Sequence, residues 1–146
     1  MSGGADPSVQ DGGCLCGAVR YRVSIPEPVS TVHCHCTICR RVSGAPVTTW
    51  ITVPRGAFTV TKGTPRRYKS SDHGDRQFCP ACGAQLTFRT RHHPDFVDVT
   101  VGTLDHPARV PPARHIWLED KIAWLHLDED LPGEPRESGS DGGAPD

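Results

Sequence analysis

Residues 33–39 of this chain place three cysteines and two histidines within seven positions. Ordinary core packing does not require such a density of thiols and imidazoles, whereas metal binding does. Zinc prefers four donors in a tetrahedron and is held well by thiolate sulfur. The segment supplies three sulfurs, from Cys34, Cys36 and Cys39, so a histidine, a remote side chain or water must take the fourth position. That choice decides whether the site is closed and structural or open and catalytic.

The other four cysteines form two close pairs, one on each side of this segment. Glycines flank the first pair, and the second is a Cys-x-x-Cys with a glycine after it. Glycine permits positive φ, which lets backbone N–H groups turn towards a bound thiolate. We therefore expect residues 12–17 to form a metal-binding knuckle rather than a strand interior. Two knuckles from distant parts of a chain make a closed four-sulfur site, which predicts a structural zinc on Cys14, Cys16, Cys79 and Cys82.

Other arrangements of the seven thiols stay open from spacing alone. The late pair, Cys79 and Cys82, could join the central three cysteines and leave Cys14 and Cys16 spare. That arrangement is less favourable, because it brings five thiols to one ion and a tetrahedral zinc site uses four. The central cysteines could also be redox-reactive, or simply buried.

The cysteine count also bears on the cell compartment. Seven is odd, so a complete disulfide framework would leave one thiol over. The first ten residues lack the basic and apolar pattern of a secretory signal, and no apolar run approaches the length of a membrane span. We expect a soluble protein of the cytoplasm, where clustered cysteines are more often metal ligands than disulfides.

A length of 146 residues suits one domain with a modest core. The hydrophobic fraction, 36%, is low, while 15 glycines and 14 prolines indicate many turns. Alternating or β-branched runs predict strands at residues 18–23, 47–53, 58–60, 86–88 and 97–101. A single helical turn is expected at residues 37–42. The predicted fold is all-β, with short antiparallel strands and little helix.

Composition also marks the expected boundaries. Residues 1–10 are small and polar and predict a disordered arm, the domain is placed at residues 11–131, and residues 132–146 are expected to be a disordered acidic tail. Net charge is −1, yet residues 128–146 hold seven acidic side chains against Arg136 alone. The basic residues occur singly or in pairs, such as Arg66-Arg67, which favours a solvated surface over a specific anion-binding patch and makes nucleic acid an unexpected partner.

Four segments together resemble one known family. They are Gly13-Cys14-Leu15-Cys16-Gly17-Ala18-Val19-Arg20-Tyr21, Cys34-His35-Cys36-Thr37-Ile38-Cys39-Arg40 with Ser43-Gly44-Ala45-Pro46, Phe78-Cys79-Pro80-Ala81-Cys82-Gly83, and His115-Ile116-Trp117. This layout is similar to the glutathione-dependent formaldehyde-activating enzymes, a family that also includes the centromere protein V type of domain. The likeness spans nearly all of residues 12–127.

The resemblance implies a β-tent fold of several coiled sheets with two zinc ions per chain. One zinc would be structural, on Cys14, Cys16, Cys79 and Cys82. The other would be catalytic, on Cys34, Cys36 and Cys39, with its fourth position open. The implied activity is that of a carbon-sulfur lyase, the reversible formation of S-hydroxymethylglutathione from glutathione and formaldehyde.

Residues near the cysteines are less clearly marked. His33 and His35 are expected to orient a ligand or face solvent, with proton transfer or metal binding as the alternative. Ser43 is expected to cap backbone groups, and Trp50 to lie in the core. His115 and Trp117 would share a strand face, with a structural role favoured over lining a pocket. Nothing orients Arg20, Arg40 or Arg41 towards a substrate.

Three functions follow as hypotheses. The first is a zinc enzyme that makes or breaks a carbon–sulfur bond in a small thiol adduct, with glutathione and an aldehyde as partners. The second is a non-catalytic zinc module whose central site is closed by a fourth protein ligand. The third is a redox sensor built on the central thiols. The oligomeric state cannot be read from the sequence.

Overall fold

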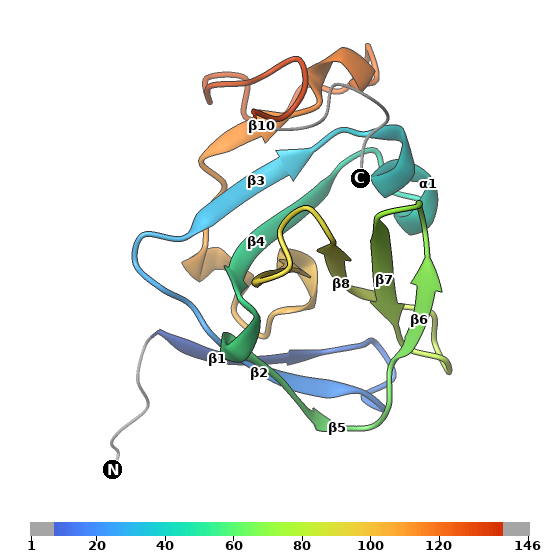
Figure 1. Cartoon of the computed structure of the whole chain (residues 1–146). Coiled ribbons are helices and arrows are strands. Elements are labelled where there is room, and N and C mark those ends of the chain that lie inside the picture. Colours follow the sequence, from blue (N-terminus) through green and yellow to red (C-terminus); the bar gives the residue numbers. More distant parts are fainter. Residues whose placement is uncertain (1–7, 139–146) are drawn as a thin grey trace.

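A computed structural model of the chain describes residues 8–138. Within that range the protein is mainly β, as predicted, with two sheets and one short α-helix (Figure 1). The strands are β1 (Val9–Gly13), β2 (Arg20–Ser24), β3 (Ser30–Cys34), β4 (Thr48–Pro54), β5 (Phe58–Lys62), β6 (Arg66–Lys69), β7 (Gly74–Phe78), β8 (Gln85–Thr90), β9 (Phe96–Thr100) and β10 (Arg114–Ile116). Helix α1 is Thr37–Ser43, and the 3-10 helices η1 to η4 are Arg55–Ala57, Val101–Thr103, Pro107–Arg109 and Leu118–Asp120.

The strands divide unequally between the two sheets. The smaller sheet has the order β1-β2-β5, and the larger has the order β10-β3-β4-β9-β8-β7-β6. The larger sheet curls above the smaller one in Figure 1. Strand β10 pairs with β3 in parallel, so the prediction of antiparallel strands is wrong at this edge. That register sets His115 beside His33 and Ile116 beside Cys34.

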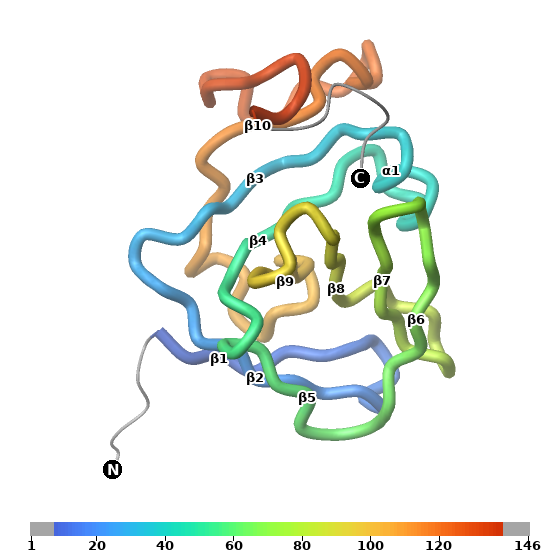
Figure 2. The backbone as a smooth tube through the Cα atoms, in the orientation of Figure 1, coloured from blue at the N-terminus to red at the C-terminus, as the bar shows by residue number. Residues whose placement is uncertain are grey.

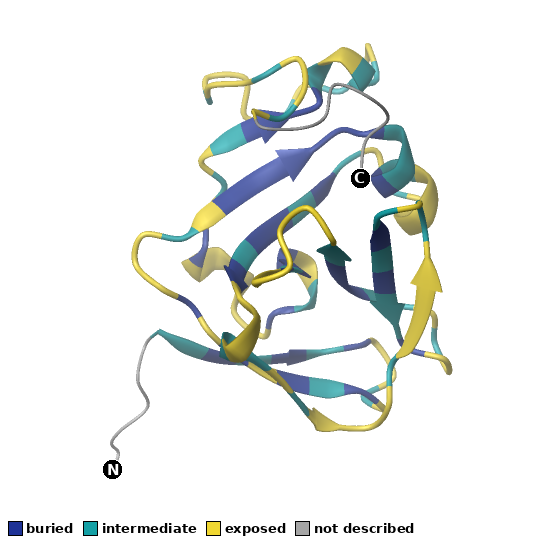
Figure 3. Ribbon diagram, viewed as in Figure 1, coloured by how far each residue is buried: buried dark blue, intermediate teal, exposed yellow. Residues whose placement is uncertain are grey.

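Alternation along β4 directs neighbouring residues into two separate cores. Ile51 packs with Tyr21 and Val99 in the first core, whereas Trp50 packs with Phe88 in the second. Adjacent residues of a strand point to opposite faces, so the larger sheet lies between the two groups. Figure 3 shows β3 and β4 largely buried and β6 exposed along its length. Burial of Trp50 confirms its predicted place in the core.

The two predicted cysteine sets lie in different cores. Cys14 and Cys79 belong to the core that contains Tyr21 and Ile51. Cys34, Cys36 and Cys39 belong to the core that contains Trp50 and Phe88. The triple set is buried as a whole, whereas Cys16 of the four-cysteine set is exposed.

The predicted N-terminal arm is wrong at its inner end. Residues 1–7 lie outside the described range, but Val9 and Gln10 begin β1 and pair with β2. Gly12 and Gly13, expected in a knuckle, belong to the same strand. A Cβ atom at Gly12 would collide with the Tyr21 ring. Close packing, rather than positive φ, therefore explains this glycine.

The predicted tail is also wrong in part. Residues 139–146 lie outside the described range, but residues 132–138 follow β10 along the outer edge of the larger sheet (Figure 2). The N–H of His115 donates to the carbonyl of Pro132 at 2.8 Å, and Glu134 donates back to the carbonyl of His115 at 3.0 Å. The Arg136 guanidinium lies over the Trp117 ring, 5.8 Å from its centroid. We call residues 132–138 the C-terminal strap.

Deletion of the strap tests its structural role. A chain that ends at Leu131 loses the hydrogen bonds to β10 and leaves that edge unpaired. Because each net hydrogen bond contributes about 1 kcal/mol, we expect a loss of roughly 2–4 kcal/mol and a fall in Tm of about 10 °C. A chain that ends at Ser138 is the matched control and should melt as the full chain does. Equal melting temperatures for the two truncations would contradict this role.

Candidate metal centres and active site

Four sulfurs from two distant segments meet beside the first core. The Sγ atoms of Cys14, Cys16, Cys79 and Cys82 all lie within 4.8 Å of one another. Cys16 Sγ is 3.7 Å from both Cys14 Sγ and Cys79 Sγ. A tetrahedron with zinc–sulfur bonds of about 2.3 Å has edges of about 3.8 Å, so these spacings fit one zinc ion. The set joins two segments that are 63 residues apart.

Backbone N–H groups around these sulfurs favour the thiolate form. Val19 donates to Cys14 Sγ at 3.2 Å, and Cys82 donates to Cys79 Sγ at 3.4 Å. Backbone hydrogen bonds from Ala84 and Cys16 lower the pKa of Cys82 to about 6. Gly17 and Gly83 have φ of 80° and 81°, the positive values that glycine adopts without strain. Both knuckle turns therefore have the predicted backbone, although the first is shorter than expected.

The other three sulfurs converge where β3 passes into α1. Cys34 ends β3, Cys36 is the N-cap of α1, and Cys39 lies in its first turn. The Cys36 Sγ accepts a hydrogen bond from the Cys39 N–H at 3.2 Å, as a serine or aspartate oxygen does at other helix N-termini. The three Sγ atoms lie within 4.8 Å of one another, and all three residues are buried. We call this set the triad.

Hydrogen bonds within the triad separate the pKa values of its thiols. Hydrogen bonds to Cys36 and Cys39 raise the pKa of Cys34 well above its usual value, and burial acts in the same direction. Hydrogen bonds from Cys34 and Cys36 hold the pKa of Cys39 well below its usual value, and the charge of Arg76 adds to this effect.

A fully buried arginine faces the triad from β7. Both terminal nitrogens of Arg76 lie 3.7 Å from Cys39 Sγ, and 1% of this residue is exposed. Its guanidinium lies 4.7 Å from the centroid of the Phe88 ring and also donates to Ser70 and Gln85. A permanent positive charge at this position stabilises negative charge on the sulfurs.

The triad opens into a small cavity of about 40 Å³, which Trp50, Arg76 and Trp117 also line. That volume holds a water molecule or the end of a thiol side chain. A second cavity of about 300 Å³ shares Phe88, Asp98 and Glu137 with the first. The two cavities are therefore adjacent.

Comparison with known proteins settles the family. The family model described as glutathione-dependent formaldehyde-activating enzyme matches residues 9–120. The chain belongs to this family. That range contains both cysteine sets, Arg76 and all the strands.

Individual known proteins are similar to much of the chain. A protein of Halomonas elongata named as a putative glutathione-dependent formaldehyde-activating enzyme is 32% identical over 127 residues, which cover 81% of this chain and 80% of that protein. An uncharacterized lyase of Schizosaccharomyces pombe is 33% identical over 85 residues, 53% of this chain and 56% of its own length. A crystal structure of a Rhodobacter sphaeroides protein is 27% identical and covers 65% of this chain and 87% of its own, with a TM-score of 0.56.

In this family member, both histidines that flank Cys34 are buried. Of the two expected roles, orienting a ligand or facing solvent, the second is therefore wrong. His33 contacts Thr49 Oγ1 and Asp128 Oδ2, each at 2.8 Å. The Nε2 atom of His35 lies 2.9 Å from Nδ1 of His115. Burial, followed by the neighbouring His115, lowers the pKa of His35 to about 4. The other ring nitrogen of His35, Nδ1, is buried and has no hydrogen-bond partner among the described residues. Within residues 8–138 no histidine groups with the triad sulfurs.

Other predicted residues have mixed outcomes. Ser43 Oγ donates to the carbonyl of Cys39 at 2.7 Å, which confirms its capping role. Arg20 pairs with Asp105 at 2.6 Å. The predicted shared face of His115 and Trp117 is wrong, because β10 ends at Ile116 and Trp117 has φ of 59°. Trp117 nevertheless lines the triad cavity.

Sequence reasoning missed Arg76 and Asp128. Arg76 lies outside the strands expected from the sequence and shortly before the Cys-x-x-Cys knuckle. Its inward position follows from the pairing of β7 with β8, where it lies opposite Phe88. Asp128 was counted only as part of the acidic end. No local pattern marked either residue.

None of the helices within residues 8–138 has the length and apolar composition needed to cross a membrane.

Proposed function

We propose that this protein is a zinc-dependent carbon–sulfur lyase that catalyses the reversible addition of glutathione to formaldehyde. In the forward direction the thiol sulfur forms a bond to the carbonyl carbon, the C=O π bond breaks, and a proton reaches the oxygen to give S-hydroxymethylglutathione. The family and the names of two similar proteins support the reaction class. The observation that carries the proposal is a buried triad that opens into a cavity.

The three triad sulfurs leave a position for substrate. Among residues 8–138, no further cysteine, histidine or carboxylate groups with them. Zinc held there would supply a fourth coordination position in which an incoming thiol loses its proton more readily. Cys34, Cys36 and Cys39 would hold the ion, while Cys14, Cys16, Cys79 and Cys82 would hold the structural one.

Charge favours thiol capture over activation of the aldehyde. Three thiolates around Zn²⁺ leave one negative charge, which weakens attraction for a carbonyl oxygen. Arg76 adds a positive charge beside Cys39 and brings the local sum to zero. An incoming thiol can therefore become an anion without facing a net negative site, because the guanidinium stabilises the added charge.

The cysteines also indicate the cell compartment in which the protein works. All seven are free thiols. A chain whose proposed activity needs seven reduced thiols suits the cytoplasm, where thiols are kept reduced. We therefore infer a cytoplasmic enzyme whose small-molecule partners are glutathione and formaldehyde.

The proposal is tested by measuring adduct formation with the zinc-loaded protein. We expect glutathione and ¹³C-labelled formaldehyde to exchange with their adduct, followed by NMR, faster than in buffer alone. Enzymes of ordinary efficiency exceed their uncatalysed reactions by at least about 10⁶-fold, so the difference should be large. Cys36→Ser is the matched inactive variant, and 2-mercaptoethanol tests whether the tripeptide is required.

Each outcome of that assay separates the candidate functions. Acceleration with glutathione that is lost in Cys36→Ser supports the lyase. Acceleration with both glutathione and 2-mercaptoethanol would support thiol addition to formaldehyde but would show that glutathione itself is not required. A wild-type rate equal to the spontaneous rate, with two zinc ions bound, would contradict the proposed enzyme activity. The protein would then be a non-catalytic zinc-binding scaffold.

A further inference from the structure

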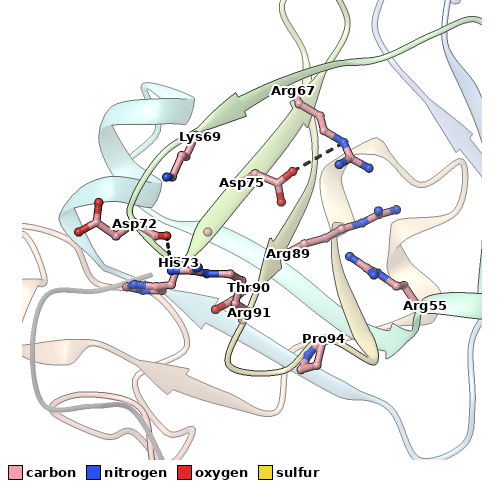
Figure 4. A pocket seen from close by; sticks show the side chains of 11 residues that line it. Arg55, Arg67, Lys69, Asp72, His73, Asp75, Arg89, Thr90, Arg91 and Pro94 are labelled. Atoms are coloured by element: carbon pink, nitrogen blue, oxygen red, sulfur yellow. Dashed lines mark hydrogen bonds and ion pairs between the residues drawn. The ribbon is translucent and has the colours of Figure 1, made fainter.

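A third cavity is separate from the triad cavity and shares no lining residue with it. It has a volume of about 620 Å³ and is bordered by η1, the β6–β7 hairpin and the end of β8 (Figure 4). No residue of the triad lines it. Its cationic lining residues are Arg55, Arg67, Lys69, Arg89 and Arg91.

The pairing of the strands separates this cavity from Arg76. Asp75 of β7 lies opposite Lys69 of β6 and Arg89 of β8, so these three side chains share one face. Arg76, the next residue along β7, points to the other face, where it meets Phe88 and the triad. The two faces of the same strands therefore carry two different groups of charge.

Positive charge dominates the cavity. Five cationic side chains face two carboxylates, Asp72 and Asp75, which gives a balance of +3 with His73 neutral. Among residues 8–138, an ion pair of 3.7 Å joins two of these groups, Arg67 and Asp75. Within residues 8–138, the side chains of Arg55 and Lys69 make no ion pair. The excess charge is thus available to an anion.

Three of the arginines converge. Figure 4 shows the guanidinium groups of Arg55, Arg67 and Arg89 gathered on one side of the cavity, from η1, β6 and β8. The Nε of Arg89 is buried and has no hydrogen-bond partner among the described residues. Burial lowers the pKa of Arg89, and repulsion from Arg55 and Arg67 lowers it further. Holding like charges and an unpaired donor close together costs free energy, and a bound anion would offset that cost.

We propose that Arg55, Arg67 and Arg89 form a binding site for a small phosphorylated molecule. A phosphate group offers three acceptor oxygens and up to two negative charges, which matches several guanidinium groups better than a single carboxylate does. Single-stranded nucleic acid is disfavoured, because no phenylalanine, tyrosine or tryptophan lines the cavity to stack on a base. The site is distinct from the triad and does not depend on the lyase activity.

Calorimetric titration of the zinc-loaded full chain tests the site, with inorganic phosphate, β-glycerophosphate and glutarate as probes at a fixed ionic strength of about 0.1 M. We expect one phosphate probe per chain to bind saturably, and glutarate to bind at least about tenfold more weakly. The stronger of the two phosphate probes distinguishes a free phosphate site from a phosphate ester site.

Two variants and a matched control locate the binding. Arg55→Gln and Arg89→Gln should each weaken phosphate binding about tenfold or more, because each removes a charge-assisted hydrogen bond. Arg41→Gln, an exposed arginine of α1 outside the cavity, should bind as wild type does. Two zinc ions per chain in every variant show that the fold is kept. If Arg89→Gln fails to fold, Arg55→Gln, at an exposed position, carries the test.

Three results would overturn the site. Phosphate that does not saturate the wild type below ~10 mM would show no specific affinity. Equal weakening in Arg41→Gln would show general attraction to a basic surface. An oligonucleotide that binds more tightly than either phosphate probe, with the same dependence on Arg55, would assign the cavity to nucleic acid instead.

Discussion

Cys79→Ser is expected to unfold the domain, whereas Cys36→Ser is expected to leave it folded with one zinc ion fewer. Cys79 is completely buried in the core between the sheets, and its sulfur lies in the set that joins residues 14–16 to residues 79–82. A structural zinc contributes on the order of 10 kcal/mol to folding, which is about the whole stability of a typical domain. Loss of this ion therefore removes most of the free energy that keeps the domain folded.

Cys36 differs because its structural role survives the substitution. Its sulfur caps α1 by accepting the Cys39 N–H, and a serine oxygen accepts the same hydrogen bond. The substitution leaves only two sulfurs for the central ion, too few to hold it tightly. Metal analysis should therefore fall from two zinc ions per chain to about one, while circular dichroism stays close to that of wild type.

Wild-type protein stripped of both ions by a chelator is the control for this comparison. It should resemble Cys79→Ser in its circular dichroism, since both lack the four-sulfur site. Equal loss of folding in Cys36→Ser and Cys79→Ser would show that the two cysteine sets do not divide their roles as proposed.

The grouping of the cysteines could be predicted because knuckles are local. A Cys-x-Cys or Cys-x-x-Cys with an adjacent glycine brings two sulfurs together through local backbone geometry. Two such turns favour one four-sulfur site, although spacing alone left other arrangements of the seven thiols open. The β-branched segment around Trp50 was predictable for a similar reason, since alternation within one strand reports which face is buried.

Residues whose environment depends on distant strands could not be predicted. Arginine is rarely buried, so an isolated Arg76 in a polar segment is expected at the surface. It is buried because β7 pairs with β8 and the sheet curls over α1, which brings residue 76 to residue 39. The burial of His35 likewise requires the parallel pairing of β10 with β3.

The C-terminal strap shows a different limit. Its composition is polar and rich in glycine and proline, which correctly indicates that it has no apolar face of its own. Its attachment uses backbone hydrogen bonds to His115 and Leu118, and these do not depend on side-chain type. An exposed edge strand accepts such a partner, and only the fold reveals that β10 is that edge.

Arg76→Gln is expected to reduce the turnover of glutathione and formaldehyde about 10- to 100-fold. Hydrogen bonds to charged groups contribute about 1.5–3 kcal/mol, and each 1.4 kcal/mol corresponds to about a tenfold change in rate. Glutamine is shorter than arginine and removes the positive charge that offsets the thiolates. Arg76→Lys keeps the charge without the planar group on Phe88, so its loss should be smaller.

Zinc affinity and pH separate an electrostatic role of Arg76 from a structural one. Without the guanidinium, deprotonation of an incoming thiol becomes harder, so the pH at which the rate is half-maximal should rise in Arg76→Gln and much less in Arg76→Lys. The second zinc should also bind more weakly in Arg76→Gln, with the four-sulfur zinc retained. Arg22→Gln removes an exposed arginine that pairs with Asp11, and this matched control should change neither quantity. Wild-type turnover and an unchanged pH profile in Arg76→Gln, with both ions bound, would leave Arg76 as a packing residue beside the triad.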